Sequence, residues 1–478
     1  MGILQHGAAI PSGASAYEIG NSIKFESDNT ESLTKSQTAS NRKTWTVSFW
    51  FKRTEINSAL QYVFEAGSSG STLLSLFING TTDWRIYDYV SGSRKLGFFS
   101  TASLSDPSAW YHIVLACDTT QGTAANRFKI YLNGEDLTAI SGYFSTAQYP
   151  DQNYETNINN SGATLSIGKA PTASTNFCGY ISEFNFIDGL MKDASDFGKY
   201  NSSGIWQPIE YTGSYGNQGY FLNFADAGDL GDDESGNGKD FTENNITAVD
   251  QATDTPTNNF CTLNPLIPYA VQSGTPVINE GATFHNGSGG WTGMKGTIGV
   301  TKGKWYWELS MGGAGGGASV IHGIQTVNSD SGESTATSAH NLLETAAWYV
   351  SGGHWIKDYT NGRDDIAASA VTHSPSNTVV YAVALNMDDG EITYYANGSV
   401  VSGLNEVNLD GLADTRYSGA IVAPFASVYN QQLAWNFGGR TTLSISSAAT
   451  DANGYGTFEY APPSGYYALC TKNLAEFG

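Results

Sequence analysis

The densest group of potential metal ligands in this 478-residue chain lies between residues 226 and 265, a stretch rich in Asp, Asn, Thr and Gly. Carboxylate oxygens are the ligands that calcium prefers, and the stretch supplies them from Asp229, Asp232, Asp233 and Asp240. Their spacing does not match an EF-hand loop. Two interpretations are open: the four aspartates bind calcium, or the stretch is an ordered connector whose Asp and Asn side chains cap turns.

A second group combines aromatic and polar side chains between Asn328 and Ser376, where the sequence departs most from the alternation of strands. Aromatic rings stack on sugar rings, and polar side chains bond to sugar hydroxyls. The residues that would form such a site are Trp348, Tyr349, His354, Trp355, Tyr359, Arg363 and Asp364. We expect an ordered loop with at least one of its two tryptophans partly exposed. The alternative is that both tryptophans anchor the loop to the domain.

A weaker candidate for sugar binding lies in the first half of the chain, around Trp84 and Tyr154. The histidines do not indicate a metal site. His340, His354 and His373 fall in one stretch but lack the i,i+2 or i,i+4 spacing of a metal site. No Gly-x-Ser-x-Gly motif occurs either, so the sequence indicates no nucleophile of that kind.

The composition limits the elements that can position these groups. Short apolar runs end in Gly, Asn and Asp turns throughout, which predicts an all-β protein. The formal net charge of −22 repels phosphate backbones and disfavours nucleic-acid binding. No apolar run reaches the length of about 18 residues that a membrane-spanning helix needs. The four cysteines are far apart and predict buried free thiols; they are Cys117, Cys178, Cys261 and Cys470.

Two Asn-Gly pairs mark the clearest hairpins. An Asn-Gly pair between two alternating runs predicts a type I′ turn, because both residues tolerate a positive φ. Residues 379–401 contain an Asp-Gly turn followed by Asn397-Gly398, which predicts three consecutive antiparallel strands. Asn133-Gly134 predicts a second hairpin in the first half.

The second half resembles SPRY domains in three motifs that agree in order and spacing. These are Gly303-Lys304-Trp305-Tyr306-Trp307-Glu308, the hairpin ALNMDDGEITYYANG, and Ala423-Pro424-Phe425 followed by Trp435-Asn436-Phe437-Gly438. The resemblance covers roughly residues 269–478. It implies an antiparallel β-sandwich that binds partners through loops at one edge and has no catalytic machinery.

The first half resembles the laminin-G-like, concanavalin A-like jelly roll over roughly residues 15–211. The motifs, in order, are NRKTWTVSFWFKR, WYHIV, FKIYLNGE and GYISEFNFIDG. In the first of them, Trp45, Val47, Phe49 and Phe51 share one face, which predicts a half-buried sandwich strand. A jelly roll followed by a SPRY-like module resembles structural proteins of marine bacteriophages. This resemblance implies a virion fibre or decoration that contacts the host surface.

Some jelly rolls of this class are glycan hydrolases, so the last motif needs a check for paired carboxylates. Glycoside hydrolysis uses two carboxyl groups, and Glu183 and Asp188 are the nearest approach to such a pair. Asn185 stands where those enzymes carry a carboxylate, and Asp188 is shorter than the Glu they require. We therefore expect a structural strand, with Tyr180, Phe184 and Phe186 among the inward residues.

We predict an all-β chain of two β-sandwiches joined by an acidic connector. The predicted parts are an N-terminal attachment segment (1–16), a laminin-G-like, concanavalin A-like jelly roll (17–212), an Asp/Asn-rich connector (213–268) and a SPRY-like sandwich (269–478). The predicted function is not enzymatic: a phage virion structural protein, as fibre or capsid decoration, that mediates adhesion to a host-surface glycan or protein.

The expected partners are other virion proteins and the host glycan or receptor, with a homotrimer favoured, neither nucleic acid nor membrane insertion, and calcium as the candidate cofactor. Two alternatives stay open, a tail-associated glycan depolymerase and a purely architectural virion subunit.

Overall fold

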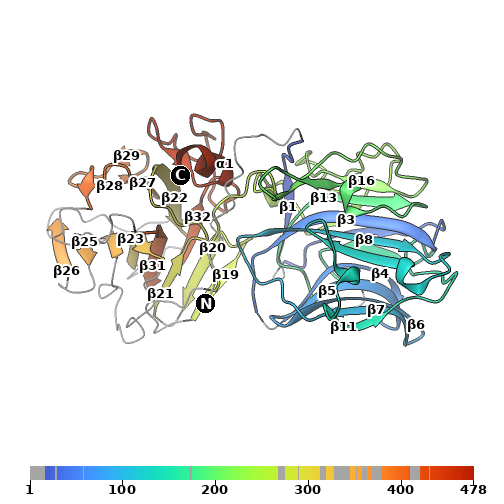
Figure 1. Cartoon of the computed structure of the whole chain (residues 1–478). Coiled ribbons are helices and arrows are strands. Elements are labelled where there is room, and N and C mark those ends of the chain that lie inside the picture. Colours follow the sequence, from blue (N-terminus) through green and yellow to red (C-terminus); the bar gives the residue numbers. More distant parts are fainter. Residues whose placement is uncertain are drawn as a thin grey trace. The chain divides into compact units, whose positions relative to one another are not determined.

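The computed structural model divides the chain into two compact units, with the division between Thr257 and Asn258 (Figure 1). The structure describes residues 17–26, 29–57, 59–171, 175–266, 275–288, 290–312, 319–327, 345–350, 353–357, 363–367, 378–409, 420–429 and 431–478. The predicted attachment segment, residues 1–16, lies outside the described residues. Both units are β-sandwiches, which confirms the predicted fold class. We call them the first and the second sandwich.

The first sandwich contains two eight-stranded antiparallel sheets. The β3 sheet has the order β10 (Glu135–Asp136), β9 (Phe128–Leu132), β8 (Trp110–Asp118), β3 (Thr44–Arg53), β13 (Gly179–Asp188), β1 (Ser22–Phe25) and β18 (Gln251–Ala252), with β16 (Tyr220–Leu222) also paired to β13. The β5 sheet has the order β11 (Phe144–Gln148), β7 (Ser93–Ser100), β6 (Asp83–Val90), β5 (Thr72–Asn79), β4 (Leu60–Ser69), β12 (Thr164–Ile167), β2 (Ser32–Ser36) and β17 (Thr242–Asn244).

Short elements complete the first sandwich. Strands β14 (Gly198–Tyr200) and β15 (Trp206–Pro208) form a separate pair. Four 3₁₀ turns are η1 (Ala124–Asn126), η2 (Leu137–Ala139), η3 (Ala194–Asp196) and η4 (Ala248–Asp250).

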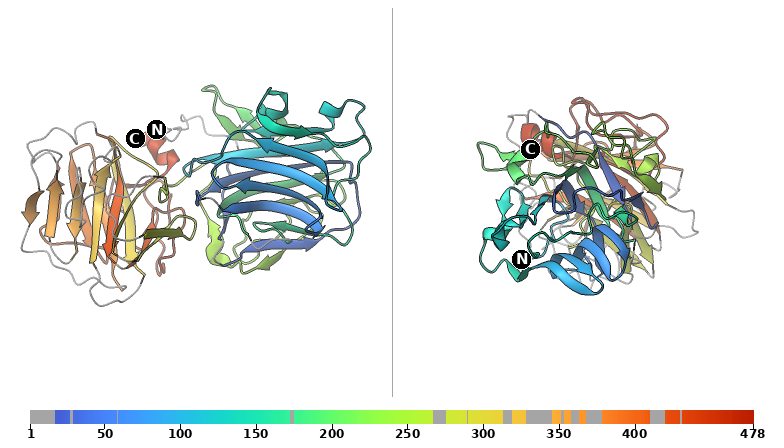
Figure 2. Two further views of the ribbon diagram at one scale, coloured as in Figure 1. Left: turned by 90° about the horizontal axis from the view of Figure 1, so that it is seen from below. Right: turned by 90° about the vertical axis from the view of Figure 1, so that its right-hand side faces the viewer.

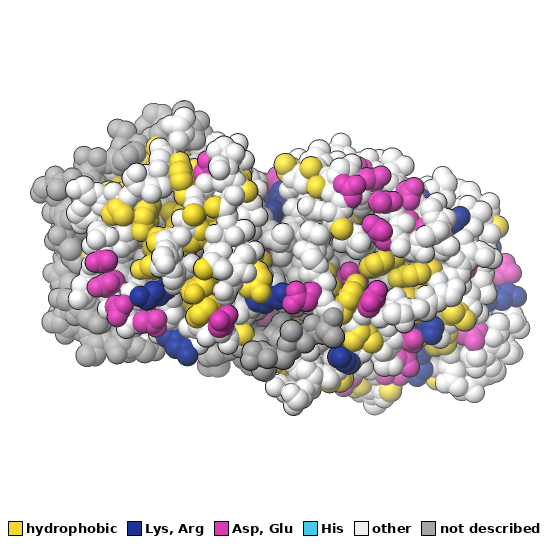
Figure 3. Space-filling model, turned by 90° about the horizontal axis from the view of Figure 1, so that it is seen from above, with side chains coloured by type: hydrophobic (Ala, Val, Ile, Leu, Met, Phe, Trp, Pro, Cys, Tyr) yellow, Lys and Arg dark blue, Asp and Glu magenta, His cyan; other side chains and the backbone are white. Residues whose placement is uncertain are grey.

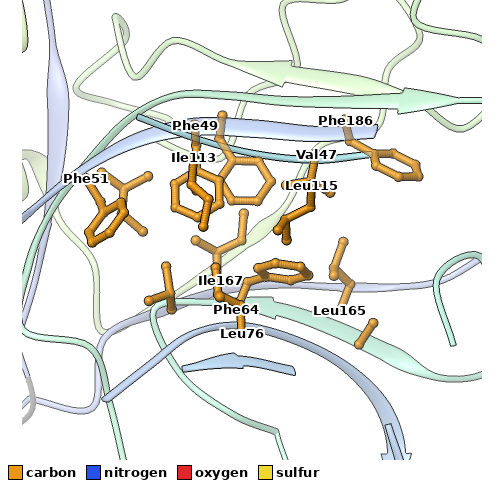
Figure 4. Close-up of a cluster of buried hydrophobic side chains, with 14 of the residues drawn as sticks. Val47, Phe49, Phe51, Phe64, Leu76, Ile113, Leu115, Leu165, Ile167 and Phe186 are labelled. Atoms are coloured by element: carbon orange, nitrogen blue, oxygen red, sulfur yellow. The ribbon is translucent and has the colours of Figure 1, made fainter. Parts of the chain in front are cut away.

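The core of the first sandwich lies between its two sheets. Figure 4 shows Val47, Phe49 and Phe51 pointing from β3 toward Phe64 and Ile167 of the facing sheet. The ring of Phe49 meets the ring of Phe64 edge-on, with 6.4 Å between centroids. All five side chains are at most 1% exposed. The alternation predicted for residues 44–53 is therefore confirmed.

The outer face of β3 differs from the prediction, because it is also buried. The segment that contains β14 and β15 covers it, and Ile187, Phe197 and Trp206 pack together there. On this face Trp50 stacks on His112 with 4.6 Å between ring centroids. Strand β3 is thus a fully buried central strand rather than a half-buried one.

The acidic connector predicted for residues 213–268 is not a separate part. Its strands β16, β17 and β18 extend the sheets of the first sandwich. Buried ion pairs hold it there. Lys24 Nζ lies 2.8 Å from Glu31 Oε1 and 2.9 Å from Asp250 Oδ1, and Lys52 Nζ lies 2.8 Å from Asp254 Oδ2. A buried charge needs a partner, so these carboxylates tie the end of the stretch to β1 and β3.

The second sandwich contains a nine-stranded and a six-stranded sheet, seen from two further sides in Figure 2. The β27 sheet has the order β19 (Thr275–Asn279), β20 (Phe284–Ser288), β32 (Gln432–Asn436), β22 (Lys304–Met311), β27 (Val380–Asn386), β28 (Glu391–Ala396) and β29 (Ser399–Val400), with β30 (Val407–Asn408) beside β28 and β33 (Tyr467–Ala468) parallel to β22. The β31 sheet has the order β21 (Trp291–Lys295), β31 (Val422–Tyr429), β23 (Ser319–Thr326), β24 (Thr345–Tyr349), β25 (Gly353–Lys357) and β26 (Arg363–Ala367). Helix α1 spans Thr471–Phe477.

Both predicted Asn-Gly hairpins are confirmed. Asn397 and Gly398 have φ of 47° and 73° and join β28 to β29, and Asn133 and Gly134 have φ of 48° and 86° and join β9 to β10. These signs are those of a type I′ turn. An aromatic ring lies on each turn glycine: a Cβ at Gly398 would be 2.5 Å from the Tyr460 ring, and one at Gly134 would be 2.4 Å from the Trp206 ring.

The prediction of one long loop over residues 328–376 is in part wrong. Strands β24, β25 and β26 lie within it and extend the β31 sheet. The rest of that stretch lies outside the described residues.

Two simpler predictions have clear outcomes. All four cysteines are buried and none forms a disulfide. Among the described residues, no helix has the length and apolar character to cross a membrane.

We expect Asp254→Asn to destabilise the first sandwich by about 3–5 kcal/mol, because it removes the carboxylate charge from the buried Lys52 ammonium. The matched control is Glu155→Gln. Glu155 is 56% exposed and lies 3.5 Å from Arg42, so its charge is worth at most about 1 kcal/mol. Denaturant unfolding measures both variants, and equal losses would contradict the role given to Asp254.

Candidate functional site

Two of the predicted sugar-binding tryptophans are core residues, which corrects the prediction for them. Trp348 is 0% exposed, and its ring centroid lies 5.8 Å from that of Tyr381 and 5.9 Å from that of Tyr394, across the second sandwich. Trp84 is also 0% exposed and meets Phe144 edge-on. A ring surrounded by protein on every side cannot stack on a sugar. Trp348 therefore anchors its stretch to the domain, as the alternative interpretation predicts.

The other predicted residues are dispersed. Tyr154 is half-buried, and its hydroxyl donates to Asp88 Oδ1 at 3.1 Å. Tyr349 is half-buried at the end of β24, with its ring 6.2 Å from that of Trp291. For β25 and β26 the structure gives the backbone register, which places His354 opposite Trp348 and brings Trp355, Arg363 and Asp364 onto the two outermost strands. Tyr359 lies outside the described residues.

A serine–histidine pair in the first sandwich has the wrong proton arrangement for catalysis. Ser48 Oγ and His112 Nε2 are 2.9 Å apart, and both residues are 1% exposed. The indole Nε1 of Trp206 donates to His112 Nδ1 at 3.0 Å. An indole nitrogen only donates, so the proton of the neutral imidazole is on Nε2 and is donated to the serine. Burial lowers the pKa of His112 to about 3. The ring therefore stays neutral and cannot accept the serine proton.

The two carboxylates of β13 bind internal donors. Tyr17 donates its hydroxyl to Glu183 Oε2 at 2.7 Å, and burial raises the pKa of Glu183 to about 7. Asp188 accepts from Ser40 Oγ at 2.5 Å, from Asn159 Nδ2 at 2.9 Å and from the Gln218 amide at 3.0 Å. Every residue of β13 is buried. The pair is thus part of the framework of the sandwich.

A β-bulge corrects the predicted facing of this strand. The register shifts between Ser182 and Asn185, and Glu183 has a φ of 52°. Because the bulge reverses the alternation, Ile181 and Phe184 both belong to the core, and Ile181 takes the inward place predicted for Tyr180. An extra residue in one strand has this effect wherever it occurs.

Three of the four aspartates predicted to bind calcium cap turns. Asp233 accepts from the backbone amides of Phe221 and Ser235 at 2.9 Å and of Lys239 at 2.8 Å. Asp229 Oδ1 and Asp240 Oδ1 each accept a backbone amide at 3.2 Å. Over the part of the chain that the structure describes, a single group of three acidic or thiol ligand atoms lies within 4.8 Å, and it includes none of these aspartates. Calcium binding by the four aspartates therefore stays a prediction, beside the capping role shown for Asp229, Asp233 and Asp240.

A narrow cleft at the edge of the first sandwich is too small for a sugar. Its volume is about 20 Å³, and its lining includes Lys35, Gln37, Asn159 and Tyr220. Such a volume accommodates about one water molecule. Lys35 Nζ lies 4.9 Å from the centroid of the Tyr220 ring and donates to the carbonyl of Lys239 at 2.7 Å. Its interactions are therefore internal.

The surface best suited to a ligand lies on the outer face of the β27 sheet. Strand β28 points Ile392 and Tyr394 into the core, so its alternate residues Glu391 and Tyr395 face outward. Tyr395 and Tyr466 pack, partly exposed, against a small cluster on this face. In Figure 3 hydrophobic side chains gather on the visible face of the second sandwich, at the left.

A buried carboxylate positions the segment that brings tyrosines to this face. Glu308 of β22 is 0% exposed. It accepts four hydrogen bonds, from Tyr306 Oη at 3.1 Å, Asn436 Nδ2 at 2.9 Å, the Glu459 amide at 2.9 Å and the Tyr460 amide at 2.8 Å. These bonds fix residues 459 and 460 over the sheet, and the Tyr460 ring rests on Gly398. We call Tyr395, Tyr460 and Tyr466, together with Glu391 and Glu406, the tyrosine face.

The acidic groups of the tyrosine face lie near its hydroxyls. The amide of Glu406 donates to Thr393 Oγ1 at 2.8 Å, which places Glu406 beside the outer side of β28. Burial, followed by the charges of Tyr395, Glu391 and Glu406, raises the pKa of Tyr466 to about 12. The Tyr466 hydroxyl therefore stays protonated at neutral pH and can donate to a ligand.

The sequence analysis missed the tyrosine face, although part of its signal was present. In TYYANG the alternation assigns Tyr394 inward and Tyr395 outward. Tyr460 and Tyr466 come from a Gly- and Pro-rich stretch without periodicity, so only tertiary contacts place them.

We expect Asp233→Asn to lower the melting temperature equally in millimolar calcium and in chelator. Asp233 accepts three backbone amides, and an Asn side chain turns an NH₂ group toward at least one of them, at a cost of about 1–3 kcal/mol. A wild-type melting temperature that rises with calcium, and no longer rises in the variant, would favour the metal interpretation instead. Thermal unfolding with and without calcium decides between them.

Comparisons with known proteins give one family match, which agrees with the β-sandwich of the first half, and several similar solved structures. Residues 25–195 match the model of the Concanavalin A-like lectin/glucanases superfamily. The chain is similar to a native heptameric SAP-like pentraxin from Limulus polyphemus (17% identity, 37% of this chain and 80% of that chain, TM-score 0.28). It is similar to the SPRY domain of human HERC1, with 15% identity over 35% of this chain and 96% of that chain and a TM-score of 0.25. It is also similar to the CBM40 of the Ruminococcus gnavus IT-sialidase bound to α2,3-sialyllactose, with 16% identity over 37% of this chain and 92% of that chain and a TM-score of 0.25. The search of curated proteins found no match.

Proposed function

We propose that this chain is a non-catalytic adhesion protein that binds a glycan on the tyrosine face of the second sandwich. The observation that carries the proposal is the group of three partly exposed tyrosines, Tyr395, Tyr460 and Tyr466, held on one sheet face beside two carboxylates. The match of residues 25–195 to a superfamily of lectins and glucanases supports the same class of ligand.

The chemistry of the tyrosine face suits a sugar. A pyranose ring has an apolar face that packs on an aromatic ring and a rim of hydroxyls that needs hydrogen-bond partners. Tyrosine hydroxyls donate and accept, and carboxylates accept from sugar hydroxyls in charge-assisted bonds. Among the described residues, neither Glu391 nor Glu406 forms an ion pair with a Lys or Arg side chain.

The side chains that a depolymerase would use are buried and bonded to internal partners, which supports binding of a glycan rather than its cleavage. His112 holds its proton toward Ser48, and Glu183 and Asp188 accept from internal donors in a fully buried strand. A reacting group must reach its substrate, and these side chains are covered by protein.

We also propose that the chain is displayed on a bacteriophage virion, as a fibre or a capsid decoration, with other virion proteins and a host-surface glycan or receptor as partners. The resemblance of a jelly roll followed by a SPRY-like module to marine phage structural proteins supports this location. A homotrimer fits the same resemblance.

We expect Tyr466→Ala to weaken glycan binding about fivefold, since one stacked ring is worth about 1 kcal/mol. Tyr429→Ala is the control, because Tyr429 is 40% exposed on the other sheet of the same sandwich. A glycan array identifies the ligand, titration measures the affinity, and melting temperatures confirm that both variants fold. Equal effects of the two substitutions, or an array without binding, would reject the tyrosine face.

We expect purified protein to release no reducing ends from host polysaccharide, and antibodies against the chain to label intact virions. Release of reducing sugars would favour the depolymerase. Virion labelling together with an array that shows no binding would favour the architectural subunit.

A further inference from the structure

The first sandwich brings one lysine and two carboxylates together in its interior. Lys24 Nζ lies 2.8 Å from Glu31 Oε1 and 2.9 Å from Asp250 Oδ1. Lys24 and Glu31 are each 1% exposed, and Asp250 is 3% exposed. The pairing of β1 with β18 sets Ile23 opposite Gln251, so Lys24 and Asp250 are the next residues along these two strands. They belong to the beginning and the end of the first sandwich in the sequence.

The amine of Lys24 is close enough to the carboxyl group of Asp250 to form an amide with it. The carbon Cγ is one bond beyond Oδ1, so Nζ and Cγ are no more than roughly 4 Å apart. Two reacting groups held in such proximity have effective concentrations of about 10⁵–10⁸ M when they are well oriented. Both side chains are also shielded from the water that would reverse the reaction. Proximity and burial thus favour condensation.

The second oxygen of Asp250 is held by hydrogen-bond donors. Asp250 Oδ2 accepts the backbone amide of Thr247 at 2.8 Å and the hydroxyl of Thr247 at 3.3 Å, in the turn η4. Negative charge develops on this oxygen when an amine attacks Cγ, and fixed donors stabilise such a charge. Oδ1, on the side of Lys24, is then the oxygen that leaves.

Glu31 has an oxygen available to carry a proton. Its Oε1 lies against Lys24 and accepts from Asn29 Nδ2 at 3.2 Å. Its Oε2 is buried and has no hydrogen-bond partner among the described residues. A charged oxygen in that position is costly, which fits a neutral acid with its proton on Oε2. Burial, opposed in part by Lys24, raises the pKa of Glu31 to about 7, so Glu31 can both donate and accept a proton at neutral pH.

We propose that Lys24 and Asp250 join in an intramolecular amide bond, with Glu31 as the acid–base group. Lys24 transfers one proton to Asp250 Oδ1, and its neutral amine attacks Cγ to form the Nζ–Cγ bond. Glu31 takes a second proton from Nζ and delivers a proton to Oδ1. The Cγ–Oδ1 bond then breaks and water leaves. One ammonium and one carboxylate become one amide and one water, and no oxidant or other reactant is needed.

The amide bond joins β1 to the residue that precedes β18, and so closes the first sandwich covalently. A cross-link between positions this distant in the sequence stabilises the fold mainly by restricting the unfolded chain. The bond is independent of the tyrosine face and of glycan binding.

The test is mass spectrometry of the purified full-length protein after denaturation. We expect an intact mass that is lower than the calculated mass by one water molecule. Trypsin does not cleave after an acylated lysine, so residues 1–35 and residues 240–295 should be recovered as one branched peptide. Lys24→Arg and Glu31→Gln should each have their calculated mass, because the first lacks a primary amine and the second lacks the carboxyl group that moves the protons.

Glu65→Gln is the matched control for Glu31→Gln and should keep the branched peptide. Glu65 is also a buried glutamate of the first sandwich, and its carboxylate accepts from Ser75 Oγ. Circular dichroism and the melting temperature confirm that each variant folds.

Three results would overturn the proposal. They are a wild type of the calculated mass, a loss of water without the branched peptide, and an undiminished branched peptide in folded Glu31→Gln. If neither Lys24→Arg nor Glu31→Gln folds, the presence or absence of the branched peptide in the wild type decides.

Discussion

Two buried lysines determine where the first sandwich ends. Lys24 and Lys52 lie on central strands of the β3 sheet and are at most 1% exposed. A buried ammonium is costly unless a carboxylate reaches it, and the chain supplies Asp250 and Asp254 from a point some 200 residues later. The stretch with these carboxylates must therefore fold back onto the sheet. Its high content of acidic residues serves the interior of the sandwich as well as the surface.

The second sandwich uses a buried carboxylate in the same way. Glu308 on β22 accepts two backbone amides from residues 459 and 460, which belong to a segment with almost no regular structure. Such a segment has few backbone partners of its own, and hydrogen bonds to a charged group are stronger than those between neutral groups. The outward position of Tyr460, and the tyrosine face with it, depends on this one glutamate.

The sequence predicts individual strands and turns well, but it does not predict which of their faces are covered by distant segments. Asn133-Gly134 and Asn397-Gly398 specify their turns by backbone conformation alone, so both hairpins are correct. The alternation around Phe49 gives the inner face of β3, but nothing local shows that a distant segment covers its outer face. Trp348 lies in a stretch that departs from strand alternation, so the sequence predicts a loop there, whereas β24 carries this residue into the core. The composition of the aspartate-rich stretch could not show that Lys24 and Lys52 would require it.

The same limit applies to the tyrosine face. The outward place of Tyr395 follows from the alternation of one strand, so this one of its three tyrosines is in principle predictable. Tyr460 and Tyr466 follow no such pattern, because they belong to a segment without periodicity whose residues 459 and 460 are bonded to the buried Glu308. Strand register matters as well, since a shift of one residue would turn Tyr395 to the opposite face of the sheet. A site assembled in this way becomes visible only when the pairing of the strands and the contacts of distant segments are known.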